Sequence, residues 1–177
     1  MRENIVKNTR TRIKRIAWIG FCSALAILLS YVEFLLPPLF VAIPGIKLGL
    51  PNVIILFVLY SIDLKHAAMV SFVRLFISAM LFGNTVTLAY SVAGAILSLT
   101  FMAILKRTKL FSTVGVSVAG GVTHNLGQIL VAMILLDTPQ IAFYMIALAI
   151  SGTVSGILVG LCGAILLSRI PKKLLIS

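Results

Sequence analysis

Residues 66–83 read HAAMVSFVRLFISAMLFG, an apolar stretch with one arginine, Arg74, near its middle. A guanidinium in the hydrocarbon layer of a bilayer costs about 2.5–3.5 kcal/mol on insertion scales. Such a side chain therefore normally faces a protein interior or a wet cavity. The stretch predicts a membrane-spanning helix that turns Arg74 toward a polar place inside a helix bundle.

The composition of the whole chain agrees with a membrane protein. Of its 177 residues, 60% are hydrophobic and only 11% are charged, and the mean hydropathy is +1.16. This excludes an ordinary soluble domain. The net charge of +11 could indicate that the protein binds nucleic acid. Nucleic acid is rejected as a partner because the basic residues form short runs between apolar segments, not one basic face.

We predict an all-α protein with a single integral membrane domain over residues 1–177 that forms a bundle of six transmembrane helices. A basic segment, residues 1–15, precedes an apolar run too long for a signal peptide, so the first helix is expected to be retained. The second span is short, since about 13 residues rise about 20 Å against a bilayer core of about 30 Å. The spans are expected at about 16–36, 50–62, 66–82, 85–105, 112–136 and 139–168.

The charges predict the orientation in the cell membrane. Basic clusters lie at the N-terminus, at Lys65, at 106–109 and at 169–173, which are alternate ends of the six spans. By the positive-inside rule, both termini are therefore expected in the cytoplasm. The loop 37–49 then lies outside, where it is either a lid over a site or a plain connector.

Large polar residues inside the spans are the candidate binding residues. They need partners away from water, which either each other or a bound ligand could supply. An outward-facing ligand pocket is favoured because, of four acidic residues, only Glu33 is expected at membrane depth to neutralise Arg74. His124 could instead be a proton-linked group. The candidate ligand-binding residues are Arg74, His124, Asn125, Gln128, Glu33, Asn52 and Tyr90.

Small residues three or four positions apart mark helix faces that allow close approach. Gly152, Gly156 and Gly160 form such a ridge in the last span. Ala17, Gly20 and Ala24 form another in the first span, which is either packed within the chain or a docking surface for a second membrane protein.

Several kinds of chemistry lack their usual residues. The sequence contains no P-loop motif, so the chain is not itself an ATPase of that class. It contains no aspartate cluster to hold magnesium diphosphate and no Ser-His-Asp or Cys-His arrangement. We therefore predict no catalytic residues, no metal site and no cofactor, and do not expect an enzyme.

Four segments carry a resemblance to a known family. They are KLGLPN at 47–52, Arg74, YSVAG at 90–94 and SVAGGVTHNLGQ at 117–128. The chain resembles the membrane proteins called heptaprenyl diphosphate synthase component I, also known as the Gx transporter family. That family is similar to the substrate-binding S components of energy-coupling factor (ECF) transporters.

The resemblance implies six helices, cytoplasmic termini and an outward-facing pocket. It also implies that a transmembrane coupling protein and two ATPases act as partners. S components carry an Ala-x-x-x-Ala pattern where this chain reads Gly20-x-x-x-Ala24, and their pocket is gated by the loop that corresponds to 37–49.

Two functions follow as hypotheses. The first is a substrate-binding subunit of an ECF-type transporter, which captures a small molecule from outside near Arg74, His124, Asn125 and Gln128. The second is a non-catalytic membrane subunit that supports heptaprenyl diphosphate or quinone biosynthesis. A purely structural membrane protein is a third reading. The sequence leaves the ligand open among a flavin, a vitamin, a quinone precursor and a prenyl compound.

Overall fold

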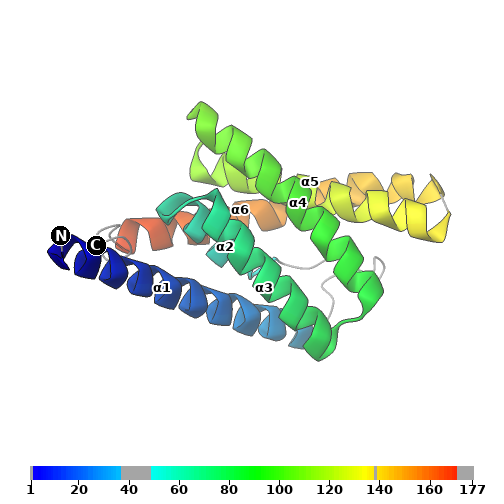
Figure 1. The fold of residues 1–177 in the computed structure, drawn as a ribbon. Coiled ribbons are helices and arrows are strands. Elements are labelled where there is room, and N and C mark those ends of the chain that lie inside the picture. The colour runs from blue at the N-terminus through cyan, green and yellow to red at the C-terminus, as the bar shows by residue number, and fades with distance from the viewer. Residues whose placement is uncertain (1, 37–48, 138, 171–177) are drawn as a thin grey trace.

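The computed structural model describes residues 2–36, 49–137 and 139–170, and this part of the chain is helical, without strands. The all-α prediction is confirmed. The predicted lid, residues 37–49, lies outside the described residues except for Gly49. The helices are α1 (Arg2–Leu35), α2 (Asn52–Ser61), α3 (Leu64–Phe82), α4 (Thr85–Thr108), α5 (Thr113–Leu136), the 3-10 helix η1 (Pro139–Tyr144) and α6 (Met145–Arg169) (Figure 1).

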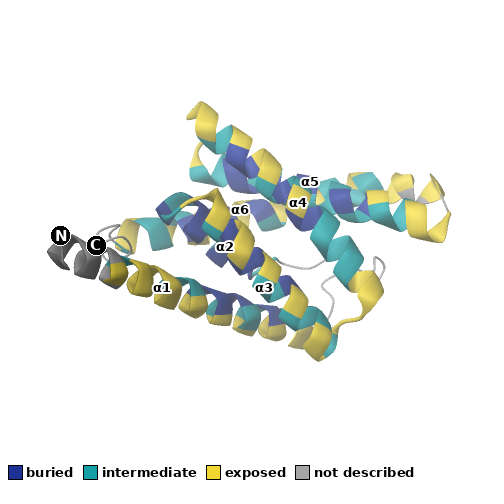
Figure 2. Ribbon diagram, viewed as in Figure 1, coloured by how far each residue is buried: buried dark blue, intermediate teal, exposed yellow. Residues whose placement is uncertain are grey.

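Five helical segments are long and apolar enough to cross a membrane. Exposed residues run along the outer sides of these helices (Figure 2), and large apolar side chains such as Phe72, Met80 and Ile134 are among them. Such apolar faces are stable in contact with lipid, whereas their exposure to water would be unfavourable. The chain is therefore a multi-pass membrane protein. The spanning segments are Thr11–Leu35, Leu64–Phe82, Thr85–Thr108, Thr113–Leu136 and Ala142–Arg169.

Helix α2 is the exception to this pattern. It has 10 residues, a rise of about 15 Å, which is half the thickness of a bilayer core of about 30 Å. Every side chain from Ile54 to Leu59 is buried, so the helix is apolar on all sides and surrounded by protein. It packs against α1, α3 and α6. By length, five of the described helices can each span a bilayer, and the predicted second span corresponds to the short, buried α2, so helix length alone does not confirm the predicted count of six.

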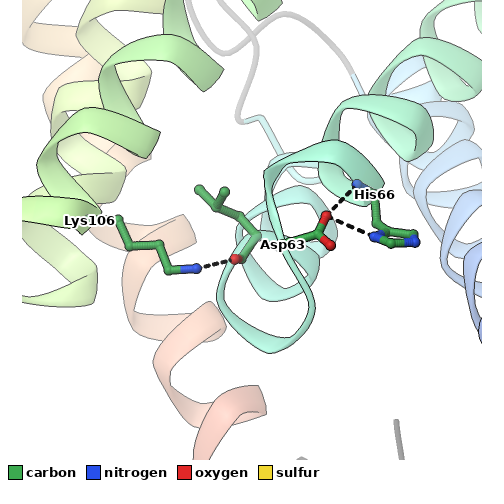
Figure 3. A network of polar contacts seen from close by, with 4 residues as sticks. Asp63, His66 and Lys106 are labelled. Carbon is green, nitrogen blue, oxygen red and sulfur yellow. Dashed lines mark hydrogen bonds and ion pairs between the residues drawn. The ribbon is translucent and has the colours of Figure 1, made fainter. Parts of the chain in front are cut away.

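Charged side chains meet the two ends of α2. At its N-terminal side, the Glu33 carboxylate accepts hydrogen bonds from the backbone N–H groups of Gly49 and Leu50. At its C-terminal side, Lys106 Nζ donates to the Leu59 carbonyl (Figure 3) and lies 5.1 Å from the centre of the Tyr60 ring. Each charge has the sign that the helix dipole favours at that end. Side chains from α1 and α4 thus pair with backbone groups at the two ends of the short helix.

The turns between helices use side-chain caps. Asp63 caps α3: its Oδ1 lies 2.9 Å from the backbone N of His66 and 2.7 Å from the ring Nδ1 of the same residue (Figure 3). Asn84 and Thr87 form a reciprocal capping box at the start of α4, and Ser112 caps α5. These caps satisfy N–H groups that a helix leaves unpaired in its first turn. They explain why the observed starts of α3, α4 and α5 lie within two residues of the predicted ones.

The helices form two groups of three. In one group, α5 packs closely against both α4 and α6, and the glycine ridge of α6 lies on α5. A Cβ atom added to Gly156 would lie 2.6 Å from Val118 Cα, and one added to Gly160 would lie 2.7 Å from Val114 Cα. The predicted close helix contact at this ridge is confirmed. Helices α1, α2 and α3 form the other group, which meets the first through α2 on α6 and α3 on α4.

Candidate functional site

A cavity of about 420 Å³ lies between the two groups of helices. It is lined from the late part of α1, the start of α2, the late part of α3 and the start of α4, together with the middle of α5 and one residue of α6. These parts lie away from the end where α1 begins and α6 finishes (Figure 1). The cavity therefore sits nearer the opposite end of the bundle from the start of α1 and the end of α6.

All seven residues that the sequence singled out as ligand-binding line this one cavity. They come from five different helices, and almost a hundred positions separate the first from the last. These residues are far apart in the sequence, so only the packing of the helices brings them together. They are Glu33, Asn52, Arg74, Tyr90, His124, Asn125 and Gln128.

Arg74 and Ser78 lie one helical turn apart on α3 and both line the cavity. Arg74 Nε and Ser78 Oγ are buried, and neither makes a hydrogen bond within the described part of the chain. Other hydroxyls on these helices donate to a backbone carbonyl one turn back, as Ser30 does to Ala26 at 2.9 Å. Ser78 does not use this local acceptor. Two buried donors therefore remain available beside the cavity.

Glu33 is held by the backbone at the start of α2. Its Oε1 accepts from Gly49 N–H and lies 3.4 Å from Leu50 N. Gly49 adopts a positive φ of 73°, which favours glycine and aims two successive N–H groups at one carboxylate. Glu33 also attracts Arg74 electrostatically. Its negative charge is thus shared between the α2 terminus and Arg74.

Two of the candidate residues on α5 are positioned by its neighbouring helices. Asn125 Nδ2 donates to the Leu148 carbonyl at 2.7 Å, which ties α5 to the first turn of α6. His124 lies against Gly94 of α4, where an added Cβ would come within 2.9 Å of the ring Cε1 atom. Asn125 thus has a structural role besides lining the cavity. Gln128 lies one turn beyond His124 on the same face.

Some cavity residues were not among the candidates from sequence. Phe34 and Phe82 both line it, and their rings contact each other in a tilted arrangement with centroids 5.0 Å apart. Their identity gave no signal, because a phenylalanine beside a cavity and one facing lipid look alike in sequence. Ser30 and Ser78 carried a weak signal, since each shares a helix face with a charged residue three or four positions away. The other missed polar lining residues are Thr87, Ser91 and Ser155.

The small residues of α1 lie on its outer surface. Ala17, Gly20 and Ala24 are exposed, and a Cβ added to Gly20 would meet nothing within 4 Å. This face of α1 therefore has no close packing partner within the described residues.

Comparison with known proteins gives one match. The model of the family described as heptaprenyl diphosphate synthase component I matches residues 22–166, well over half of the chain. The matched range contains every cavity-lining residue. No curated protein and no solved structure matches the chain.

Proposed function

Because this chain belongs to the heptaprenyl diphosphate synthase component I family, and because its helices surround a polar cavity, we propose that it is a substrate-binding membrane subunit. In this proposal it resembles the S component of an energy-coupling factor transporter and captures a small molecule from outside the cell.

One observation carries the proposal: Arg74 and Ser78 keep buried polar atoms without a partner beside a cavity of about 420 Å³. An unpaired buried polar group costs about 1–3 kcal/mol, and a charged group costs more. A structural network that satisfied itself would not leave these donors open. A ligand that fills the cavity would supply the missing acceptors.

The direction of capture follows from the proposed orientation. The basic runs at 106–109 and 169–173 favour the cytoplasmic side. The C-terminal ends of α4 and α6, which carry Lys106, Arg107 and Arg169, lie toward the end of the bundle where α1 begins, away from the cavity (Figure 1). The cavity then belongs to the outer half of the cell membrane, where a ligand enters without crossing the bundle.

ATP-driven transport would require partners, because the sequence contains no P-loop motif. We propose that a transmembrane coupling protein docks on the exposed small residues Ala17, Gly20 and Ala24 of α1 and links the subunit to two ATPases. Small side chains allow two helices to approach closely in a membrane.

The first test is native mass spectrometry of the tagged protein released gently from its own host's membranes. We expect a coupling protein and ATPases to copurify. Gly20→Leu should remove them, whereas Ala68→Leu, a change at an exposed alanine of α3, should not. A bare protein in every preparation would contradict the transporter proposal.

A second test addresses the cavity. If a small molecule copurifies with the wild-type protein, Arg74→Ala should abolish its binding while leaving the protein assembled. Retention of the molecule at unchanged affinity would refute the assignment of this cavity.

The family's printed name favours a second candidate function, since "component I" names one part of a synthase. Here the chain would be a non-catalytic membrane subunit that supports heptaprenyl diphosphate or quinone biosynthesis. A prenyl synthase would then copurify in place of the ATPases, and adding the chain would raise that enzyme's rate or product length. No effect on such an enzyme would count against this candidate.

A further inference from the structure

We propose that the cavity binds a compact organic molecule with a single carboxylate, and that Arg74 and Ser78 hold this carboxylate. The inference deepens the proposed function and rests on it, because it names the class of ligand for the same cavity.

The two donors fit the two oxygens of one carboxylate. Arg74 and Ser78 are separated by one turn of α3, and both line the cavity. Side chains at this spacing lie above one another on a single helix face. Arg74 Nε and Ser78 Oγ are buried without hydrogen bonds in the described part of the chain. An ionised carboxylate has two oxygens that only accept, so it can take a guanidinium and a hydroxyl together.

Glu33 sets the charge of the ligand. Its carboxylate accepts hydrogen bonds from the N–H groups of Gly49 and Leu50, at the positive end of the α2 dipole, so its negative charge is shared between these groups and Arg74. Arg74 therefore keeps enough positive charge to be matched by one further negative charge. A ligand group with two negative charges would leave one uncompensated near Glu33, which is costly where water is largely excluded.

The other residues that line the cavity indicate the chemistry of the rest of the ligand. Phe34, Phe82 and Tyr90 offer aromatic surface, while Asn52 and Gln128 offer amide groups. The volume of about 420 Å³ lies toward the small end of the range of about 300–1,000 Å³ typical of ligand pockets. These features fit a compact, partly apolar body with a few polar groups, and they do not fit a long prenyl chain.

Three small molecules that carry different head groups on the same phenyl ring test which head group the cavity prefers. They are benzoate, benzamide and phenylphosphonate, tested on the full-length protein in detergent at pH 8 and constant ionic strength. Thermal unfolding is followed by the fluorescence of Trp18 and the tyrosines. We expect benzoate to raise the unfolding temperature in a dose-dependent way. Neutral benzamide and dianionic phenylphosphonate should raise the unfolding temperature far less.

Matched variants place the effect at the proposed site. Arg74→Gln should weaken the apparent affinity for benzoate by roughly tenfold to a hundredfold, as expected for the loss of a hydrogen bond to a charged group. Ser78→Ala, a smaller change that should fold even if Arg74→Gln does not, should weaken it several-fold. Arg107→Gln removes an exposed arginine from the end of α4, outside the cavity, and should change nothing.

A fourth variant tests the role of Glu33. Glu33→Gln removes the negative charge, so the difference between benzoate and phenylphosphonate should narrow in that variant.

Clear outcomes overturn the inference. Equal stabilisation by benzamide and benzoate would show that the ligand needs no negative charge, which contradicts the inference. Stronger stabilisation by phenylphosphonate would replace a carboxylate ligand with a phosphate-like one. No response to benzoate, or an unchanged response in both Arg74→Gln and Ser78→Ala, would remove the site. If any of these occurs while the coupling protein and ATPases still copurify, only the ligand class fails. If those partners are absent, the transporter proposal itself fails.

Discussion

A guanidinium at membrane depth is costly, and Arg74 has two features of this fold that reduce the cost. Glu33 attracts it electrostatically from α1, and the cavity beside it gives access to water or to a ligand. Glu33 lies on another helix, and the cavity needs lining residues from five helices besides α3. The functional meaning of Arg74 therefore depends on the neighbours that packing gives it, and Glu33 is the neighbour whose removal is most informative.

Glu33→Gln should lower the stability of the protein. Glutamine keeps the size and one accepting oxygen but loses the charge that faces both the α2 terminus and Arg74. Charges at helix ends contribute about 0.3–2 kcal/mol, so a decrease of that order is expected in thermal unfolding in detergent. Asp137→Asn is the matched control: it removes an acid at the exposed C-terminal end of α5, where asparagine tolerates the positive φ of 45°. Equal effects of the two changes would contradict the special role of Glu33.

At the scale of elements, α2 has the most unusual environment. A helix of 10 residues buried on all sides cannot leave its terminal backbone groups to water. Lys106 reaches from α4 to the Leu59 carbonyl, and Glu33 serves the other end. The central helix is thus fixed by residues from two different parts of the chain.

Lys106→Met should loosen this arrangement. Methionine keeps the length and apolar stem but removes the donor to Leu59 and the cation near Tyr60. A hydrogen bond to a charged group contributes about 1.5–3 kcal/mol, so a clear fall in unfolding temperature is expected. Lys65→Met, at an exposed position in the first turn of α3, should leave that temperature nearly unchanged. A similar response from both variants would mean that the contact at α2 contributes little.

The contact between α5 and α6 depends on glycine at α6. Gly156→Ala places a Cβ 2.6 Å from the backbone Cα of Val118, and a backbone atom cannot rotate away. The helices must then separate, which costs about 1–3 kcal/mol as overpacking generally does. Gly20→Ala makes the same chemical change on α1 where nothing lies within 4 Å, and should be neutral in thermal unfolding. A neutral Gly156→Ala would contradict the observed packing.

At the scale of the whole molecule, the helices alternate in direction. The N-terminal end of α1 and the C-terminal end of α6 lie at the same end of the bundle (Figure 1). An even number of crossings brings two ends to one side of a membrane, and an odd number brings them to opposite sides. The placement therefore fits the even number of crossings predicted from the sequence, in which the short α2 is the second crossing.

Reporter fusions at each terminus test this topology. We expect a fluorescent reporter to be active, and a phosphatase that works only outside the cytoplasm to be inactive, at both ends. A phosphatase inserted at the turn after Gly83 should be active and is the positive control. Termini on opposite sides would mean that α2 does not complete a crossing.

The sequence by itself determined the helical class, the long apolar helices and most of their boundaries, because hydropathy and capping are local properties. It also identified the candidate residues, since large polar groups at membrane depth stand out wherever they occur. Only the tertiary structure decided that α2 is the buried centre and that Glu33 serves its N-terminal end. It also brought Arg74, Tyr90 and His124 to one cavity. Those relations depend on which helices pack together, and that is set by contacts such as Gly156 on Val118 between residues far apart in the chain.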